Sequence, residues 1–224
     1  MPATMTLNYF GLPGRAEATR VALAYAGKDF EDHKMDFAGY GACKWAGKGL
    51  PVLEMDGAEY TQSTALLRYA GKLGGLYPED ALAALKVDEI VMLGEDIMGK
   101  IFACMGEKDD TVAKGLLAGK KLVRAHERGA HNEPVVSSKY NENVVKTLLE
   151  VLTTKIAASS SKFCVGDSLT IADLQVHAII ANVEANFLTG IPTTLIKDTA
   201  APLLVVQAAV LEDPKVKAYY ASKA

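Results

Sequence analysis

The sequence predicts an α/β domain followed by an all-α domain, and the order of local patterns along the chain carries this prediction. Up to Pro78, short strand-like and helical segments follow in the order β-α-β, a loop, and then β-β-α. A parallel βαβ unit followed by a hairpin and a closing helix forms a small sheet domain. From residue 81 onward, apolar residues recur at helical spacing and we find no strand pattern. We therefore expect two domains, residues 1–79 and 85–224, separated by the stretch LGGLYPED.

Each element of the first domain has its own local signal. The segment TLNYF is typical of a strand, GRAEATRVALAYAG has apolar residues at helical spacing, and FEDHKM alternates like a second strand. In PVLEMDGAEYT, an Asp-Gly turn separates two strands, which is a strong hairpin signal. The expected elements are a strand at 6–10, a helix at 14–27, a strand at 30–35, an irregular glycine-rich stretch at 36–50, a hairpin at 51–61 and a helix from residue 63.

The second domain contains one unusually clear helix start. In VGDSLTIADLQV, Thr170 is placed to cap a helix and Asp173 follows three residues later, which is the spacing of a capping box. We interpret this motif as structural and not catalytic. The helices expected in this half cover 81–106, 112–130, 138–158, 171–188 and 202–222, with Pro134, Pro192 and Pro214 at or near their breaks.

Composition and charge exclude several classes of function. The net charge of −3 gives no electrostatic reason to expect nucleic acid or an anionic membrane as a partner. Three widely separated cysteines without a CxxC motif favour a reducing compartment. We find neither a secretory signal nor a continuous apolar run of the ~18 residues that a membrane span needs. We therefore expect a cytoplasmic protein.

Motifs for nucleotides, metals and nucleophilic serine are missing from the sequence. There is no GxGxxG, no GxxxxGK[ST] and no GxSxG. His126 and His131 are five residues apart, which is not the spacing that places two ligands on one helix face. We expect no metal site.

Three pairs of residues remain as candidates, each with two interpretations. Leu50-Pro51 opens the third strand: a cis bond there would turn Leu50's backbone groups toward a peptide-like ligand, but spacing alone favours an ordinary edge-strand proline. Ser63, after Gln62, is a natural N-cap, but the free N–H groups of a helix start could also hold a carboxylate. Tyr9 and Phe10 could simply be core aromatics. No pair decides the function by itself.

Together these segments resemble a known family. The string LNYFGLPGRAEATRVALAYAG…FEDHKM…LPVLEMDG…TQSTALLRYAGKLGGLYP resembles the N-terminal domain of cytosolic glutathione transferases, and among the tyrosine-using classes it is closest to the sigma class. VDEIVMLGEDIMGKI and FCVGDSLTIADL resemble helical segments of the same family. The resemblance covers nearly the whole chain in order. It implies a thioredoxin-like domain, an all-helical domain and a cytoplasmic homodimer that uses glutathione as co-substrate, without a metal, in detoxification.

The resemblance also implies roles for individual residues. Tyr9 would donate its hydroxyl to the glutathione sulfur, and Arg15 would add positive potential beside it. Leu50 and Pro51 would lie beside the cysteinyl part of glutathione, Gln62 and Ser63 at the γ-glutamyl end, and Asp96 would reach glutathione bound in the partner subunit. Phe10 and Gly49 are also implied to contact glutathione.

The loop before Pro51 departs from the sigma pattern of a tryptophan followed four residues later by a lysine. Counting from FEDHKM places this pair at Tyr40 and Lys44, whereas Trp45 and Lys48 are the rivals when counting back from Pro51. Spacing favours Lys44 as the cation for the glycyl carboxylate. The pocket for the second substrate is expected between Tyr9, Phe10, Leu12 and the helix near Met98–Met105.

The expected reaction is addition of the glutathione thiolate to a small hydrophobic electrophile. Two alternatives remain open on the same scaffold. One is a glutathione-dependent isomerase of the prostaglandin D synthase type, and the other is a non-enzymatic, crystallin-like protein. The presence of Tyr9, Gln62, Ser63 and Asp96 together argues against the crystallin-like alternative.

Overall fold

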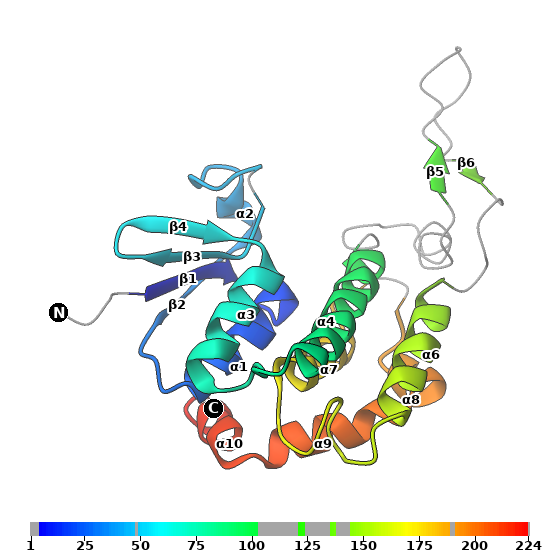
Figure 1. The fold of residues 1–224 in the computed structure, drawn as a ribbon. Coiled ribbons are helices and arrows are strands. Elements are labelled where there is room, and N and C mark those ends of the chain that lie inside the picture. The colour runs from blue at the N-terminus through cyan, green and yellow to red at the C-terminus, as the bar shows by residue number, and fades with distance from the viewer. Residues whose placement is uncertain are drawn as a thin grey trace.

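The first part of the chain forms a four-stranded mixed sheet with helices, as the sequence predicts. The structure is a computed structural model that describes residues 5–47, 49–102, 121–123, 135–137, 144–188 and 191–223 (Figure 1). Its first elements are β1 (Met5–Phe10), the 3-10 helix η1 (Gly14–Ala16), α1 (Glu17–Tyr25), β2 (Glu31–Met35), α2 (Phe37–Tyr40), β3 (Val52–Met55), β4 (Ala58–Thr61) and α3 (Ser63–Gly74).

The strand order β2-β1-β3-β4 places β1 inside the sheet. β1 pairs in parallel with β2 and antiparallel with β3, and β3 pairs antiparallel with β4. Helices α1 and α3 contact each other and lie against one face of the sheet (Figure 1). This arrangement brings the end of β1 and the start of β3 to the same region of the sheet.

The segment 36–50 is not entirely irregular, because it contains the short helix α2. The Asp36 side chain caps this helix by accepting a hydrogen bond of 2.5 Å from the Gly39 N–H. Asp is a preferred N-cap residue, so Asp36 is the local signal for α2 that our reading of the glycine-rich stretch missed.

The second part of the chain is mainly helical and is organised around α7. Nearly every residue of α7 is buried, and it packs against α4, α1 and α9. The helices are α4 (Ala81–Phe102), α6 (Val144–Ala157), α7 (Ile171–Glu184), α8 (Leu195–Thr199), α9 (Leu203–Glu212) and α10 (Pro214–Ala221). No helix among the described residues is long and apolar enough to cross a membrane.

The expectation of a helix over 112–130 and of no strand after residue 81 is wrong. Lys121–Val123 (β5) and Val135–Ser137 (β6) form a short antiparallel pair. Both runs contain valine, which favours strands, and helical spacing cannot identify an apolar run of only three residues. Residues 103–120, 124–134 and 138–143 lie outside the described residues, and with them parts of three expected helices.

The predicted capping box at the start of α7 is confirmed. The Asp173 carboxylate accepts hydrogen bonds from the Thr170 N–H at 2.7 Å and from the Cys164 N–H at 2.6 Å, and Thr170 Oγ1 accepts one from the Ala172 N–H. Because both Thr170 and Asp173 are buried, these bonds are shielded from water. They fix the start of the helix on which the second domain is built.

A buried polar chain connects α7 and α10 to the first domain. His177 Nε2 lies 2.6 Å from the Tyr220 hydroxyl, which donates a hydrogen bond of 2.7 Å to Glu17. Burial lowers the pKa of His177, and the charges of Glu17 and Glu184 oppose this shift without cancelling it. The protonated imidazole is therefore less favourable in the folded protein than in the unfolded chain.

This pKa shift predicts a loss of stability in mild acid. Because the folded pKa of His177 lies below the unfolded value of about 6.5, its contribution is complete above that pH and declines as the pH falls. Between pH 7.5 and 5.5 the unfolded pKa of about 6.5 limits the loss in the free energy of unfolding from this group to at most about 1.4 kcal/mol. Denaturant titrations of the wild type and His177→Gln at both pH values measure it: equal losses in the two proteins would contradict the assignment.

Candidate active site

Tyr9 ends β1 with its side chain buried and its hydroxyl only partly used. The Tyr9 oxygen accepts a hydrogen bond of 3.0 Å from the Arg15 N–H. No described residue accepts the hydroxyl hydrogen of Tyr9, so that hydrogen is available to a ligand. Burial raises the pKa of Tyr9, and the Arg15 N–H and nearby positive charges only partly oppose it. The phenol is therefore a protonated donor at neutral pH.

Gly14 makes the position of Tyr9 possible. It has a φ of +52°, and a Cβ built on it would lie 2.2 Å from Tyr9 Cε1 and 2.4 Å from the Tyr9 hydroxyl oxygen. Only glycine lets the backbone approach the ring this closely. The Pro13-Gly14 dipeptide was visible as a loop signal, but its contact with Tyr9 was not predictable from it.

Arg15 does not act as an isolated positive charge. Its Nε lies 3.1 Å from Glu95 on α4, and its guanidinium lies 5.1 Å from the centre of the Phe102 ring. Glu95 therefore offsets part of the positive potential expected at this place. The sequence reading had not assigned Glu95 to the site.

The Leu50–Pro51 peptide bond is cis, as the peptide-binding interpretation predicts. Leu50 packs partly against the core and Pro51 is buried just before β3. Gly49 precedes them with a φ of +82°. Lys48, one of the two candidate cations, lies outside the described residues.

Ser63 is not the N-cap of α3, which corrects the structural interpretation of this residue. Gln62 is at the N-cap, where its side chain makes no capping hydrogen bond, and Ser63 is the first helical residue. Gln62 has a φ of +74°, a region that residues other than glycine rarely adopt and that costs about 1–3 kcal/mol. The Ser63 hydroxyl makes no hydrogen bond with any described residue. The start of α3 thus offers a hydroxyl and free N–H groups.

In the loop after β2, Lys44 and Trp45 lie in different environments. The Lys44 ammonium forms ion pairs with Glu54 and, at 2.9 Å, with Glu59; the hydrogen bonds to these two carboxylates raise its pKa. Trp45 is buried, and its Nε1 has no hydrogen-bond partner among the described residues. Tyr40 packs edge-on against Phe10 with ring centres 5.4 Å apart.

On α4, Asp96 is exposed and makes no ion pair with a described residue. Met98 is 1% exposed and belongs to the core, so it does not line an open pocket for the second substrate as expected. Met105 lies outside the described residues. The described part of the chain contains no cluster of three or more potential metal ligands.

Another residue that the sequence reading missed is Asn182 of α7. It is fully buried and bonds both backbone groups of Gly14. A polar residue inside the most apolar stretch of the sequence was the available signal, since buried amides require partners.

Comparisons with known proteins show which family this chain resembles along its length. The family model described as the glutathione S-transferase N-terminal domain matches residues 5–72, and that of the C-terminal domain matches residues 120–223. Glutathione S-transferase 1 of Ascaris suum is 30% identical over 189 residues, which are 82% of this chain and 84% of that protein. Glutathione S-transferase 3 of Caenorhabditis elegans is 29% identical over 224 residues, 97% of this chain and 95% of that protein.

Two further similarities concern a prostaglandin synthase and a solved structure. Hematopoietic prostaglandin D synthase of Gallus gallus is 39% identical over 95 residues, 41% of this chain and 47% of that protein. The crystal structure of the glutathione S-transferase from Ascaris lumbricoides superposes with a TM-score of 0.70 at 26% identity, covering 99% of this chain and 98% of that one. The two-part match along the chain and the Ascaris suum relative lead to one conclusion: this chain belongs to the glutathione S-transferase family.

Proposed function

We propose that this protein conjugates glutathione to small hydrophobic electrophiles, with Tyr9 stabilising the thiolate. The observation that carries this proposal is the state of the Tyr9 hydroxyl: its oxygen accepts the Arg15 N–H, and its hydrogen has no acceptor among the described residues. A buried, protonated phenol with a free hydrogen can donate to a sulfur anion.

One hydrogen bond from Tyr9 can supply the free energy needed to lower the pKa of the glutathione thiol. A thiol has a pKa of about 8.5, and only its thiolate attacks electrophiles well. A charge-assisted hydrogen bond contributes about 1.5–3 kcal/mol, which corresponds to roughly one to two units of thiol pKa. The thiol proton leaves to solvent, and the sulfur forms a bond to the electrophilic carbon. From an aryl halide the halide leaves as an anion; in addition to an unsaturated carbonyl the C=C electron pair moves toward the carbonyl oxygen, and the α-carbon then takes a proton from solvent. The tyrosine keeps its own proton throughout.

The rest of glutathione would bind along the start of β3 and the start of α3. The cis peptide at Leu50–Pro51 supports an extended ligand against Leu50's backbone. The unbonded Ser63 hydroxyl and the first N–H groups of α3 suit the γ-glutamyl carboxylate, and the positive φ of Gln62 is the kind of strain found at binding sites. We assign the γ-glutamyl end to Gln62 and Ser63.

We also propose a cytoplasmic homodimer in which Asp96 reaches glutathione in the partner subunit. Support comes from the exposed position of Asp96 on α4 without an ion-pair partner among the described residues. We retain 1–79 and 85–224 as the proposed domains. Sedimentation equilibrium tests the dimer, which a fully active monomer would contradict.

For the glycyl end we expect Lys44→Ala to weaken glutathione binding a few-fold, with the turnover of the saturated enzyme kept, since this contact lies far from the sulfur. Lys44 neutralises Glu54 and Glu59, and its removal would leave both carboxylates facing the anionic glycyl end. Glu59→Gln should strengthen binding, because it releases Lys44 from one partner. Titration of the wild type, Lys44→Ala, Glu59→Gln and Lys48→Ala with glutathione tests this prediction. A larger loss of glutathione affinity in Lys48→Ala than in Lys44→Ala would assign the role to Lys48.

The similarity to a prostaglandin D synthase keeps glutathione-dependent isomerisation as the second candidate. A panel of aryl halides, unsaturated carbonyls and a prostaglandin endoperoxide, each with and without glutathione, tests both. Consumption of glutathione with the electrophile supports conjugation, whereas product formation without glutathione consumption supports isomerisation. Inactivity toward the whole panel would contradict both and favour a crystallin-like role.

A further inference from the structure

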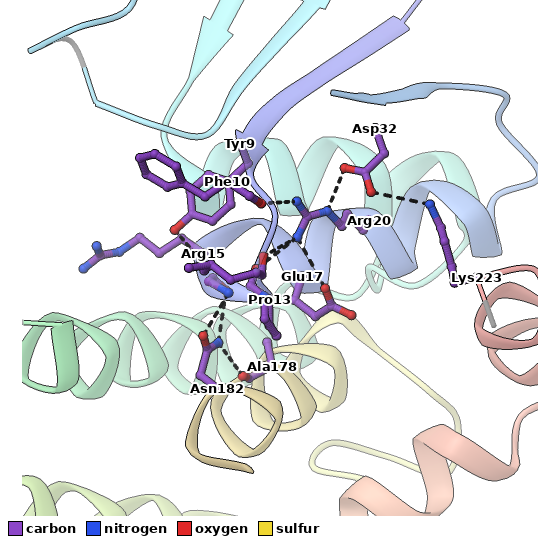
Figure 2. Close-up of polar contacts among 12 residues, drawn as sticks. Tyr9, Phe10, Pro13, Arg15, Glu17, Arg20, Asp32, Ala178, Asn182 and Lys223 are labelled. Carbon is purple, nitrogen blue, oxygen red and sulfur yellow. Dashed lines mark hydrogen bonds and ion pairs between the residues drawn. The ribbon is translucent and has the colours of Figure 1, made fainter. Parts of the chain in front are cut away.

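The loop between β1 and α1 is held by polar contacts from two sides (Figure 2). On one side, Arg20 of α1 donates hydrogen bonds to three backbone carbonyls and is itself held by two carboxylates. Its acceptors are Phe10 at the end of β1 (3.0 Å) and Leu12 (2.8 Å) and Pro13 (3.1 Å) in the loop, and its carboxylate partners are Asp32 at 2.8 Å and Glu17 at 3.5 Å. All of these residues belong to the first part of the chain.

On the other side, Asn182 reaches the loop from α7. Its carbonyl oxygen accepts a hydrogen bond of 2.8 Å from the Gly14 N–H, and its amide donates to the Gly14 carbonyl at 3.2 Å and to the Ala178 carbonyl at 2.7 Å. Asn182 is 0% exposed, so these bonds have no competition from water. Asn182 thus holds one residue of the loop at both of its backbone polar groups.

The Gly14 carbonyl and the Arg15 N–H belong to the same peptide group, which is planar. Asn182 binds the oxygen of this group, and the N–H of the same group donates to the Tyr9 hydroxyl at 3.0 Å. Rotation of this peptide would therefore misalign the Arg15 N–H. Movement of Gly14 would also push on the Tyr9 ring, which lies in the space that a Cβ on Gly14 would occupy.

We propose that Asn182 is a positioning residue for Tyr9: it fixes the Gly14–Arg15 peptide so that the Arg15 N–H engages the phenol oxygen and the phenol hydrogen points to the glutathione sulfur. The proposal rests on the function proposed for Tyr9. It makes thiolate formation in the first domain depend on a side chain of the helical domain, 168 residues away in sequence.

The test is the pKa of the glutathione thiol in the binary complex, followed by thiolate ultraviolet absorbance against pH. In Asn182→Ala we expect this pKa to rise by roughly half a unit to one unit, less than in Tyr9→Phe, because the hydroxyl remains but is less well oriented. Turnover at neutral pH should fall several-fold, while the KM for glutathione changes little. Because the Arg20 contacts remain, we expect the variant to fold.

Asn182→Asp provides a second variant of the same volume. It keeps an acceptor for the Gly14 N–H but loses the donors to the Gly14 and Ala178 carbonyls, so its thiol pKa should also rise. Thr170→Ala is the matched control, because it removes a buried cap at the other end of the same helix without touching the loop. Its thiol pKa should stay at the wild-type value.

Three outcomes would overturn the proposal. A wild-type thiol pKa in both Asn182 variants, with a raised pKa in Tyr9→Phe, overturns the positioning role and leaves the role of Tyr9 intact. An equal rise in Thr170→Ala shows a general effect of destabilising α7. An unchanged thiol pKa in Tyr9→Phe overturns the role of Tyr9 and, with it, this inference.

Discussion

Tyr9→Phe is expected to fold, to bind glutathione and to lose most of its turnover. The substitution removes one hydroxyl and leaves the buried ring in place. The lost hydrogen bond to the thiolate is of the charge-assisted kind, so we expect a fall of roughly 10- to 150-fold in turnover at neutral pH and a rise of about one to two units in the thiol pKa. Glutathione affinity should change little, because the proposed anchors of the peptide lie at Leu50, Gln62 and Ser63.

The pH profile distinguishes this role from a structural one. Raising the pH converts bound thiol to thiolate without help from Tyr9, so the variant should recover much of its activity in alkaline solution. The variant also leaves the Arg15 N–H without its acceptor, which costs about 1–3 kcal/mol of stability at most. Turnover that is reduced equally at every pH, with an unchanged thiol pKa, would remove Tyr9 from the proposed mechanism.

Among the proposed substitutions, Asp173→Ala is expected to cause the largest loss in the free energy of unfolding. The carboxylate accepts hydrogen bonds from the Cys164 N–H, the Thr170 N–H and the Thr170 hydroxyl, and it is 0% exposed. Alanine would leave two buried N–H groups without partners, at about 1–3 kcal/mol each. We expect a loss of about 2–6 kcal/mol in the free energy of unfolding, which is a large share of the 5–15 kcal/mol typical of a folded protein.

Asp167→Ala is the matched control for this substitution. Asp167 lies in the same loop but is exposed, so its removal should change the free energy of unfolding by about 0.5 kcal/mol or less. Chemical denaturation of both variants measures the difference. A loss below about 1 kcal/mol in Asp173→Ala would show that the buried capping box does not hold the start of α7.

Several elements of the fold could be predicted because their signals lie within a few residues of each other. The Asp56-Gly57 turn predicted the β3–β4 hairpin, and the spacing of Thr170 and Asp173 predicted the start of α7. The helix expected over 112–130 was wrong where β5 lies, because a strand of three residues is too short for hydrophobic periodicity to identify.

The candidate site was predictable where the family resemblance covers it, and otherwise only in part. The family resemblance identified Tyr9 as a candidate, whereas for Leu50–Pro51 the spacing alone favoured an ordinary edge-strand proline, and the cis peptide bond was found only in the structure. The ion pair of Arg15 with Glu95 joins residues 80 positions apart, and neither has a local signal for the other. The same holds for Lys44, whose position in the loop does not reveal the two carboxylates that bind it.

The sequence by itself determined the order of β1 to β4 with α1 and α3, the hairpin, the capped start of α7 and the family, because turns, caps and periodicity depend on neighbouring residues. Only the tertiary structure decided that Gln62 and not Ser63 occupies the N-cap position of α3, and that Asn182 holds Gly14 against Tyr9. The physical reason is that a buried amide bonds whichever backbone groups the packing of α7 against α1 brings within reach, and that packing is a property of the whole core.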